Sequence, residues 1–388
     1  MNDNNHLFFV GTKIYFGQKC SYMLIDIVLK ENWKKIGLIV DSVVLKSKII
    51  QNIINDLKES KVQLVIEAYN GPEPTYHYLQ NVRSKFMGIK LEAMIGIGGG
   101  SVLDIAKGIA VLVYNKKNAI DYRGFPKLNN KVLPIICMPT TAGTGSEITP
   151  NASFIDTEEE KKLGINGEFV RPKYAFLDPE LTISCPERPS ISAGVDALVH
   201  AHDSFLSKKS TSLSKVFSME GFKKVYTHLS DVVRNPNNVD SRSEVLYGAM
   251  LAAIGMIHGG GGPTSVMSYP LGVYYNVPHG IAGGIFLPEV IEYNINNGYL
   301  GYSIFYDSVL SNGTQMTKEE KSWFFLDHLK NNWIELNIPK DITEYGYTIN
   351  GEKKFIQTCM NAKAGLDTNP VKFDDLSIQS ILSNLTPN

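Results

Sequence analysis

The stretch IGIGGGSVLDIAKG (Ile95–Gly108) decides the fold, because an apolar strand runs into three glycines and then into a helix. Glycines at such a turn let the backbone approach a phosphate closely, and the free amides at a helix start attract negative charge. Ser101 can cap the helix and donate a hydrogen bond. We therefore predict a phosphate-binding turn at Gly98, Gly99, Gly100 and Ser101, although purely structural turns share this pattern.

The segments around this turn alternate between strand and helix. Four short apolar runs predict strands, at residues 35–41, 62–71, 93–98 and 132–141. Helical spacing of apolar residues predicts helices between them, at residues 45–60, 77–90 and 102–114. This rhythm favours an α/β domain with a parallel sheet and helices on both faces.

The second half of the chain has few strand candidates. Apolar residues recur at helical spacing in residues 190–208, 213–229 and 241–256, which predicts an all-α domain. The segment DPELTISCPERPS (178–190) contains three prolines and two serines, which favour a break between elements, so we place the boundary there. The expected domains are residues 1–187, which would bind a dinucleotide, and residues 188–388, which would hold metal and substrate.

Composition excludes several protein classes. The chain has 388 residues, with 43% hydrophobic and 20% charged, which is ordinary for a globular protein. A net charge of -1 argues against nucleic acid or an anionic membrane as the main partner. No apolar run has the length of a membrane span, and MNDNNHLFFV lacks the pattern of a secretory signal. Four isolated cysteines without a CxxC pair fit the cytoplasm.

A second polar loop follows the last predicted strand, in MPTTAGTGSEIT (Met138–Thr149). Its small residues and hydroxyls can contact a cofactor. Two such loops at the carboxyl ends of parallel strands predict a dinucleotide across the sheet crevice. Asp41 ends the first of these strands, where a carboxylate would bind an adenosine ribose and repel the 2′-phosphate of NADP. We therefore favour NAD over NADP, although Asp41 is equally consistent with a strand-end turn.

The helical half contains candidate metal ligands. In GVDALVHAHD (Gly194–Asp203), Asp196 and His200 are four residues apart and share one face of a helix. A carboxylate and an imidazole at this spacing can hold one divalent metal, although a simple hydrogen-bonded pair has the same spacing. His279 lies between Pro278 and Gly280, in a rigid setting that suits a ligand as well as a structural histidine.

Together these residues resemble the iron-containing (group III) alcohol dehydrogenase family, over nearly the whole chain. The resemblance is carried by motifs in this order: TKIYFG (12–17), GPEPT (71–75), IGGGSVLDIAK (97–107), PTTAGTGSE (139–147), FLDPELT (176–182), GVDALVHA (194–201), YPLGVYYNVPHGIAGGIFLP (269–288) and CMNAKAGLDTNP (359–370). It implies the dehydroquinate synthase-like architecture, in which an NAD(P)-binding α/β domain precedes a helical domain and the active site lies in the cleft between them.

The resemblance also implies roles for individual residues. It places the pyrophosphate at the glycine turn and Ser101, and the ribose at Asp41. Further cofactor contacts would come from Asp104, Thr140, Thr141, Thr144, Ser146, Lys162 and Leu181. The family metal, iron or zinc, is held by an aspartate, a histidine on the same helix and two later histidines. Asp196, His200 and His279 match three of these four.

The fourth ligand does not match. A gap-free alignment places Ser265 where the family has its third ligand, a histidine, and Tyr269 where many members have another histidine near the substrate. Ser265 and Tyr269 share a helical face. His258 lies two turns earlier, roughly 10 Å away at about 1.5 Å per residue, and could replace the ligand only if Gly259–Gly262 bend the chain.

The resemblance implies reversible hydride transfer between NAD and an alcohol, aided by a divalent metal, with Tyr269 and His279 as catalytic residues. Alternatives are a metal-independent reductase, a sugar-acid oxidase such as 3-deoxy-manno-octulosonate 8-oxidase, a lyase related to dehydroquinate synthase, and a homologue with a decayed metal site. The expected partners are a small alcohol, aldehyde or sugar-derived substrate and further copies of the chain, as a homodimer or larger oligomer.

Overall fold

The computed structural model describes residues 6–310 and 315–386. Residues 1–5 lie outside the described part. They are half of the stretch MNDNNHLFFV, which lacks the pattern of a secretory signal. Internal contacts divide the chain into two compact units. One comprises Phe9–Pro186, and the other comprises Glu187–Asn388 together with a short N-terminal segment that ends at Phe8.

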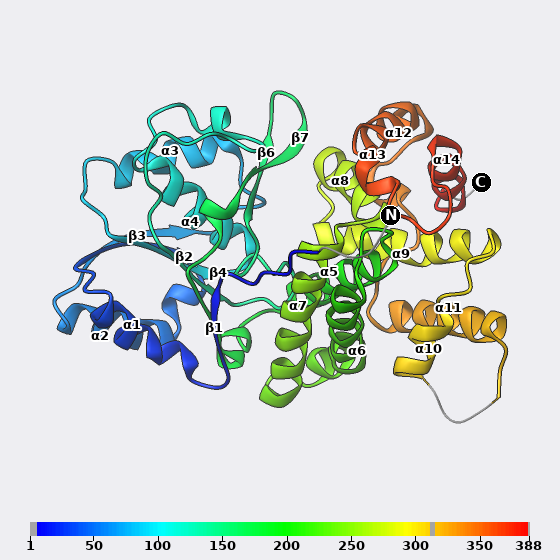
Figure 1. The fold of residues 1–388 in the computed structure, drawn as a ribbon, viewed down its shortest axis with the longest axis horizontal. Coiled ribbons are helices and arrows are strands. Elements are labelled where there is room, and N and C mark those ends of the chain that lie inside the picture. Colours follow the sequence, from blue (N-terminus) through cyan, green and yellow to red (C-terminus); the bar gives the residue numbers. More distant parts are fainter. Residues whose placement is uncertain (1–5, 311–314, 387–388) are drawn as a thin grey trace. The chain divides into compact units, whose positions relative to one another are not determined.

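The first unit is built on a six-stranded sheet, ordered β1-β8-β5-β4-β2-β3 (Figure 1). All neighbouring strands run parallel, which confirms the predicted fold class. The strands are β1 (Lys13–Phe16), β2 (Lys35–Asp41), β3 (Gln63–Tyr69), β4 (Ala93–Gly98), β5 (Ile135–Pro139) and β8 (Tyr174–Leu177). The helices are α1 (Leu24–Lys30), α2 (Lys48–Glu59), α3 (Tyr76–Phe86) and α4 (Gly100–Leu112).

The two faces of this sheet carry separate apolar cores, as period-two strands require. Ile39 and Met94 pack with α3 and α4, while Leu38 and Ile95 pack with α1 and α2. Figure 1 shows the two helix pairs on opposite faces of the sheet. Both faces of β2 and β4 are therefore buried, which explains why their sequences are continuous apolar runs.

The strand order creates a topological switch point between β2 and β4. From β2 the chain moves outward to β3, then returns past β2 to form β4 and continues to β5 and β8 on the other side. Loops after β2 and β4 therefore diverge, and ligands of open parallel sheets bind at such a switch point. Asp41 ends β2 and Gly98 ends β4, so both candidate cofactor residues lie at this switch point.

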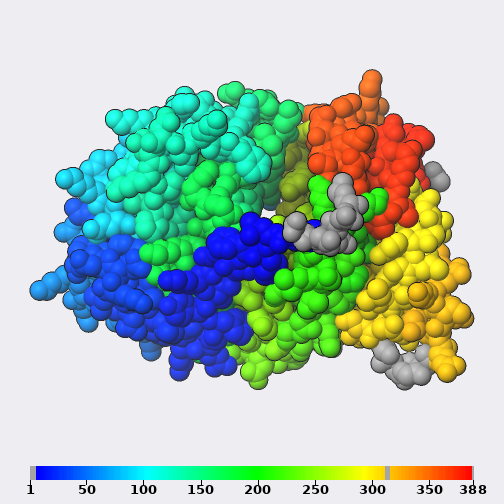
Figure 2. All heavy atoms as spheres, viewed as in Figure 1, coloured from blue at the N-terminus to red at the C-terminus, as the bar shows by residue number. Residues whose placement is uncertain are grey.

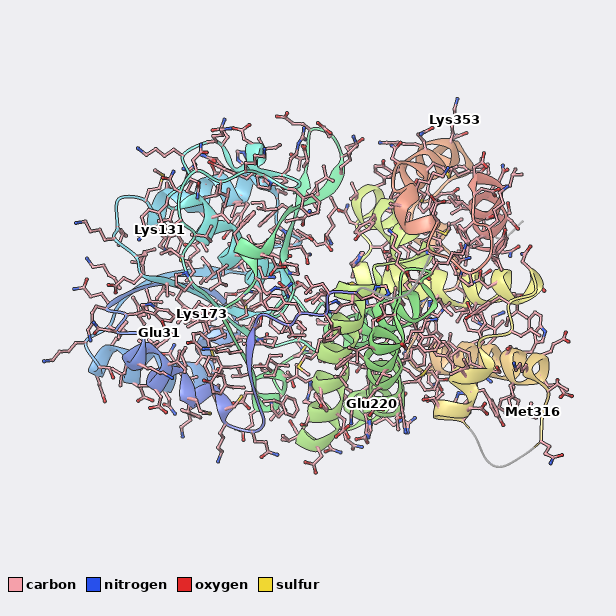
Figure 3. All side chains as sticks on the ribbon, viewed as in Figure 1. Glu31, Lys131, Lys173, Glu220, Met316 and Lys353 are labelled. Atoms are coloured by element: carbon pink, nitrogen blue, oxygen red, sulfur yellow. The ribbon has the colours of Figure 1, made fainter. Side chains whose placement is uncertain are left out.

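The sequence pattern missed both strands at the other edge of the sheet. β1 pairs with β8 from Lys13 opposite Tyr174 to Phe16 opposite Leu177. Lys173, the residue before β8, forms an ion pair of 2.7 Å with Glu31; both are labelled in Figure 3. Part of the edge is exposed, since Phe16 is 41% accessible, and the N-terminal atoms, coloured blue, lie at the surface in Figure 2. The pattern also missed an antiparallel hairpin, β6 (Asn151–Asp156) and β7 (Lys161–Asn166).

The second unit is helical, as predicted. Its helices are α5 (Glu187–Leu206), α6 (Ser212–Arg234), α7 (Val239–Gly259), α8 (Pro263–Tyr275), α9 (His279–Asn296), α10 (Ser303–Val309), α11 (Lys318–Glu335), α12 (Glu352–Asn361), α13 (Lys363–Leu366) and α14 (Asp375–Asn384). The glycine run between α7 and α8 bends the chain by 105°. Within the described ranges no single helix has the length and apolarity to span a membrane, and only the bent pair α7–α8 meets those two criteria jointly.

The N-terminal segment of the chain joins the helical unit. The ring of Phe8 stacks on His258 of α7, with centroids 4.1 Å apart, and on Phe217 of α6, at 5.3 Å. Phe9 already belongs to the α/β unit. The α/β unit is therefore inserted in sequence between two parts of the helical unit.

Candidate functional site

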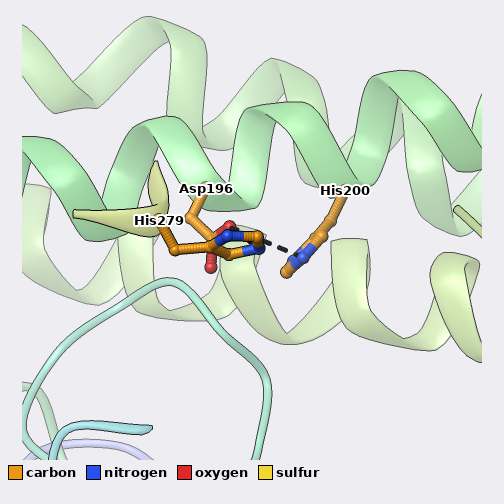
Figure 4. Close-up of side chains that lie close together, drawn as sticks. All are labelled: Asp196, His200 and His279. Carbon is orange, nitrogen blue, oxygen red and sulfur yellow. Dashed lines mark ion pairs between the residues drawn. The ribbon is translucent and has the colours of Figure 1, made fainter. Parts of the chain in front are cut away.

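Three candidate metal ligands converge in the helical unit. The nearest nitrogen and oxygen atoms of Asp196, His200 and His279 all lie within 4.8 Å of one another. Asp196 Oδ1 lies 3.5 Å from His200 Nε2 and 3.9 Å from His279 Nε2. Figure 4 shows the three side chains directed at a common point.

Local sequence explains this convergence. Asp196 and His200 are one helical turn apart on α5, so their side chains leave the same face. His279 is the first residue of α9, and Pro278 precedes it as the N-cap. Proline fixes the backbone at this helix start, which directs the first side chain of α9 across to α5.

The donor set suits a divalent metal. One carboxylate and two imidazoles are common zinc ligands, and three protein ligands with an open position are typical of catalytic zinc. Asp196 and His200 are buried, at 5% and 8% accessibility, so the carboxylate needs a compensating charge or donor. Among the described residues, no hydrogen-bond partner faces the buried Nδ1 of His200. These residues fit a bound metal, and the orphaned nitrogen leaves His200 without the outer support that metal-bound histidines usually have.

Tyr269 of α8 lies against the same group. Its ring stacks on His279 with centroids 5.2 Å apart and an interplanar angle of 25°. The side chain of Tyr269 is 39% accessible, whereas Asp196 and His200 are buried and His279 is partly buried. Ser268 Oγ lies 3.4 Å from His279 Nδ1, the nitrogen away from Asp196. The phenol therefore stands next to the candidate metal position with one side open.

The two candidate cofactor loops meet in the α/β unit. The amide of Thr140, which follows β5, donates to the carbonyl of Gly98, the last residue of β4, at 3.0 Å. A Cβ on Gly100 would lie 2.7 Å from Thr144 Cγ2, so only glycine permits this approach. Gly99 is the N-cap of α4 and provides no side-chain cap, so the expected cap from Ser101, which is the second residue of the helix, does not form. The helix start therefore offers backbone amides to an anion, beside the hydroxyls of Thr141 and Thr144.

Asp104 and Ser146 occupy a buried hydrogen-bond cluster just behind these loops. Ser146 Oγ donates to Asp104 Oδ1 at 2.6 Å, and the amide of Ser153 donates to Asp104 Oδ2 at 2.9 Å. Lys107 Nζ donates to Ser146 Oγ at 2.8 Å. The sequence prediction overlooked Lys107, although it lies two turns into the helix that begins at the glycine turn.

The remaining cofactor candidates have structural partners. Asp41 Oδ1 accepts hydrogen bonds from the amides of Val43 and Val44, at 2.8 and 3.1 Å, so it caps the turn after β2. Lys162 on β7 forms an ion pair of 2.9 Å with Glu73. Leu181 is 3% accessible and packs in the core on the α1–α2 face of the sheet. Leu181 could touch a cofactor only through its narrow exposed edge.

Comparison with known proteins places this arrangement in a family. Residues 11–179 match the iron-containing alcohol dehydrogenase model, and residues 190–386 match the C-terminal model of the same family. This chain belongs to the iron-containing alcohol dehydrogenase family. Its curated relatives are alcohol dehydrogenases and aldehyde reductases.

Two relatives and one solved structure illustrate the family match. The NAD-dependent methanol dehydrogenase of Bacillus methanolicus is 28% identical over 262 residues, 68% of this chain and 69% of that protein. Long-chain-alcohol dehydrogenase 1 of Geobacillus thermodenitrificans is 26% identical, over 90% of this chain and 88% of its own. Sulfoacetaldehyde reductase from Bifidobacterium kashiwanohense, solved in complex with NAD+, shares the fold with a TM-score of 0.88 and 22% identity, covering 99% of this chain and 100% of that one.

In this chain, Ser265 is bonded to Asp203 and not to the candidate metal group. Ser265 Oγ and its backbone amide donate to Asp203 Oδ2 at 2.7 and 2.8 Å, and the amide of Gly262 donates to the same oxygen at 2.9 Å. Burial raises the pKa of Asp203, but hydrogen bonds from His202 and Ser265 and the His202 charge outweigh it, so the pKa is lowered. Asp203 thereby anchors the start of α8.

Two other histidines, His202 and His258, also have partners outside the candidate metal group. His202 is buried, at 1% accessibility. Its Nδ1 lies 3.0 Å from Asp203 Oδ1, and its ring stacks on Tyr302. His258 stacks on Phe8. The glycine run after His258 bends the chain by 105°. Within residues 6–310 and 315–386, the group that could hold a metal nevertheless contains only Asp196, His200 and His279.

Proposed function

We propose that this protein transfers a hydride reversibly between an alcohol and NAD, with a divalent metal held by Asp196, His200 and His279. The convergence of these three ligand atoms within 4.8 Å, in a member of the iron-containing alcohol dehydrogenase family, carries the proposal. When bound, the metal would act as a Lewis acid on the substrate oxygen, and NAD would accept the hydride.

Each residue of the proposed site would have a distinct role. The Asp196 carboxylate would offset part of the positive charge of the metal. The imidazoles of His200 and His279 would bind the metal through nitrogen without adding charge. Tyr269, stacked on His279 and partly open, would orient the substrate oxygen through its phenol. The glycine turn and the hydroxyls of Thr141 and Thr144 would hold the pyrophosphate.

NAD is favoured over NADP by Asp41 at the end of β2, where its charge would repel a 2′-phosphate. Two similar proteins point the same way, since one is named an NAD-dependent dehydrogenase and another was solved with NAD+. In this assignment the α/β unit, Phe9–Pro186, binds NAD and the helical unit holds metal and substrate. The expected domains 1–187 and 188–388 differ from these units at the segment ending at Phe8 and at Glu187. A homodimer or larger oligomer remains a prediction, which light scattering after size exclusion would test.

A sugar-derived substrate has less support than a simple alcohol. The sequence offered Ser265 and Tyr269 as two polar groups for such a substrate, but the Ser265 hydroxyl is bonded to Asp203. Only Tyr269 remains as a polar contact from that pair.

Metal analysis combined with an activity screen tests the proposal. The protein is purified without chelator or added metal, zinc and iron are measured by plasma mass spectrometry, and alcohols and sugar acids are screened with NAD and NADP. We expect close to one metal per chain and activity that Asp196→Asn abolishes. Metal below about a tenth of an equivalent after incubation with zinc or iron would overturn the metal-assisted mechanism. Activity persisting without metal would favour the metal-independent reductase.

A further inference from the structure

Ser268 of α8 is a buried residue beside the candidate metal group, with 1% accessibility. Its Oγ lies 2.7 Å from the backbone carbonyl of Ser265 and 3.4 Å from Nδ1 of His279. The carbonyl is three residues earlier on the same helix, whereas His279 begins α9. Ser268 therefore joins α8 to one of the three candidate ligands.

These two contacts of Ser268 determine which ring nitrogen of His279 carries the proton. A serine hydroxyl has one proton to donate, and a carbonyl oxygen can only accept. The shorter contact takes that proton, so Ser268 donates to the Ser265 carbonyl and presents a lone pair to His279. Nδ1 of His279 is then the donor of the longer bond. Because a neutral imidazole has a single N–H, this bond leaves Nε2 unprotonated.

Nε2 is the nitrogen of His279 that faces the other two candidate ligands, as Figure 4 shows. It lies 3.9 Å from Asp196 Oδ1, which is longer than a hydrogen bond between these two atoms. Metal ligation needs an imidazole nitrogen without a proton. The contact with Ser268 therefore selects the form of His279 that can bind a divalent ion.

α8 also restrains the ring of His279 in other ways. Tyr269, the next residue, stacks on its face at 5.2 Å, and the Asp203 carboxylate fixes the start of the helix through Ser265. His200 differs, because among the described residues no hydrogen-bond partner faces its buried Nδ1. Metal-bound histidines almost always donate their second N–H to an outer partner. His279 has such a partner in Ser268.

We propose that Ser268 is a positioning residue for the metal: it accepts the Nδ1 proton of His279 and thereby presents the Nε2 lone pair to the ion. The inference rests on the proposed metal site. Ser268 acts through His279 and needs no contact with the metal or the substrate. Without its hydroxyl, the imidazole proton can occupy Nε2, from which it must leave before a metal binds.

The first test reads the tautomer of His279 in the metal-free protein by nuclear magnetic resonance. The chain has eight histidines, so labelling histidine with nitrogen-15 gives a simple spectrum. Long-range proton–nitrogen correlation at about pH 8.5, where imidazoles are neutral, shows which ring nitrogen carries the proton. The signal that disappears in His279→Gln identifies His279. We expect the proton on Nδ1 in wild type and a substantial fraction on Nε2 in Ser268→Ala.

The second test measures zinc affinity by calorimetry after the protein has been freed of metal. Ser268→Ala should bind zinc about 10–100-fold more weakly, as is typical when an outer partner of a metal-bound histidine is removed. Thr264→Val is the matched control on the same helix. Thr264 is buried and, within the described residues, its hydroxyl has no hydrogen-bond partner, while valine keeps its shape. This variant should bind zinc within about threefold of wild type.

A wild-type His279 with its proton on Nε2 would overturn the proposal, and so would a tautomer or a zinc affinity that Ser268→Ala leaves unchanged. Equal weakening of zinc binding in Thr264→Val would show a general disturbance of α8 and would also overturn it. If Ser268→Ala does not fold, Ser268→Cys takes its place, because a thiol fills a similar space and accepts hydrogen bonds only weakly. A wild-type protein that binds no zinc would overturn the proposed metal site instead, while the tautomer still tests the bond to Ser268.

Discussion

Ser265 and Asp203 are joined by two hydrogen bonds to one carboxylate oxygen, from the Ser265 hydroxyl at 2.7 Å and from its amide at 2.8 Å. The position where the family resemblance implies a metal-binding histidine is therefore occupied by a residue that fastens one helix to another. The sequence shows the substitution, and the structure shows what the substituted residue does. This relationship leads to two predictions that separate stability from metal binding.

Ser265→Ala should destabilise the protein without changing its metal site. The variant leaves the buried Asp203 carboxylate without its hydroxyl donor, which should lower the free energy of unfolding by about 1–3 kcal/mol. Zinc affinity, measured by calorimetry, should stay within about threefold of wild type. Ser383→Ala, at an exposed serine of α14, is the matched control and should change stability by less than about 0.5 kcal/mol. A large loss of zinc affinity in Ser265→Ala would mean that the hydroxyl is a ligand after all.

Ser265→His should raise the affinity for zinc and lower the stability of the metal-free protein. An imidazole can complete the group formed by Asp196, His200 and His279, so zinc should bind about tenfold more tightly or better. The same variant loses the hydroxyl bond to Asp203, so the metal-free protein should unfold at lower denaturant concentration. Unchanged zinc affinity in a folded variant would show that position 265 does not face the three ligands.

Removing a ligand should remove the metal. Asp196→Asn keeps the shape of the side chain but loses its charge, and zinc affinity should fall by about a hundredfold or more. Plasma mass spectrometry after dialysis measures the bound metal. His258→Asn serves as the control, because His258 lies outside the group and should leave the metal content unchanged. Equal loss of metal in both variants would contradict the assignment of ligands.

Asp41→Ser should relax the choice of cofactor. The carboxylate disappears from the end of β2, so NADP should no longer be repelled. The ratio of kcat/KM for NADP to that for NAD should rise about tenfold or more. A serine can still accept from the amides of Val43 and Val44, which keeps the turn after β2 capped. An unchanged ratio would mean that Asp41 has only the capping role.

Glu147 should make stability fall as pH rises. Burial raises the pKa of Glu147 from 4.5 to about 7, against the opposing effects of a backbone hydrogen bond and the Lys107 charge. Because the folded state favours the protonated acid, this contribution is complete below pH 4.5 and is lost as pH rises through 7. The difference in unfolding free energy between wild type and Glu147→Gln should therefore fall by about 3 kcal/mol from pH 4 to pH 8. A flat difference curve would show that Glu147 titrates normally.

Sequence patterns predicted the parts of this fold that depend on local periodicity. β2, β4 and β5 are buried on both faces, so each is a continuous apolar run that can be recognised without its neighbours. β1 and β8 have four residues each and pair with one another across about 160 positions of sequence, as the Lys13–Tyr174 register shows. Such short segments carry little periodic signal, and their pairing depends on the assembled sheet.

The candidate site shows the same division. The spacing of Asp196 and His200 predicts a shared helical face, whereas the approach of His279 depends on how α9 packs on α5. The glycine run does bend the chain, since α7 and α8 are separate helices at 105°, yet His258 lies outside the group formed by Asp196, His200 and His279. The Lys107 cluster was missed because its acceptors lie in the loop after β5 and at the start of β6, and a single lysine on a helix is normally exposed.

The stacking of Phe8 on His258 and Phe217 has a consequence for the biosynthesis of the chain. A ribosome makes Phe8 before the α/β unit and its partners afterwards, so the helical unit cannot complete its packing until the whole inserted unit has been synthesised. The same topology defines how the gene can be divided. A fragment that begins after Pro186 contains the helices but lacks Phe8. To restore the stacking on Phe217 and His258, the segment that ends at Phe8 would have to be joined to this fragment by a new linker.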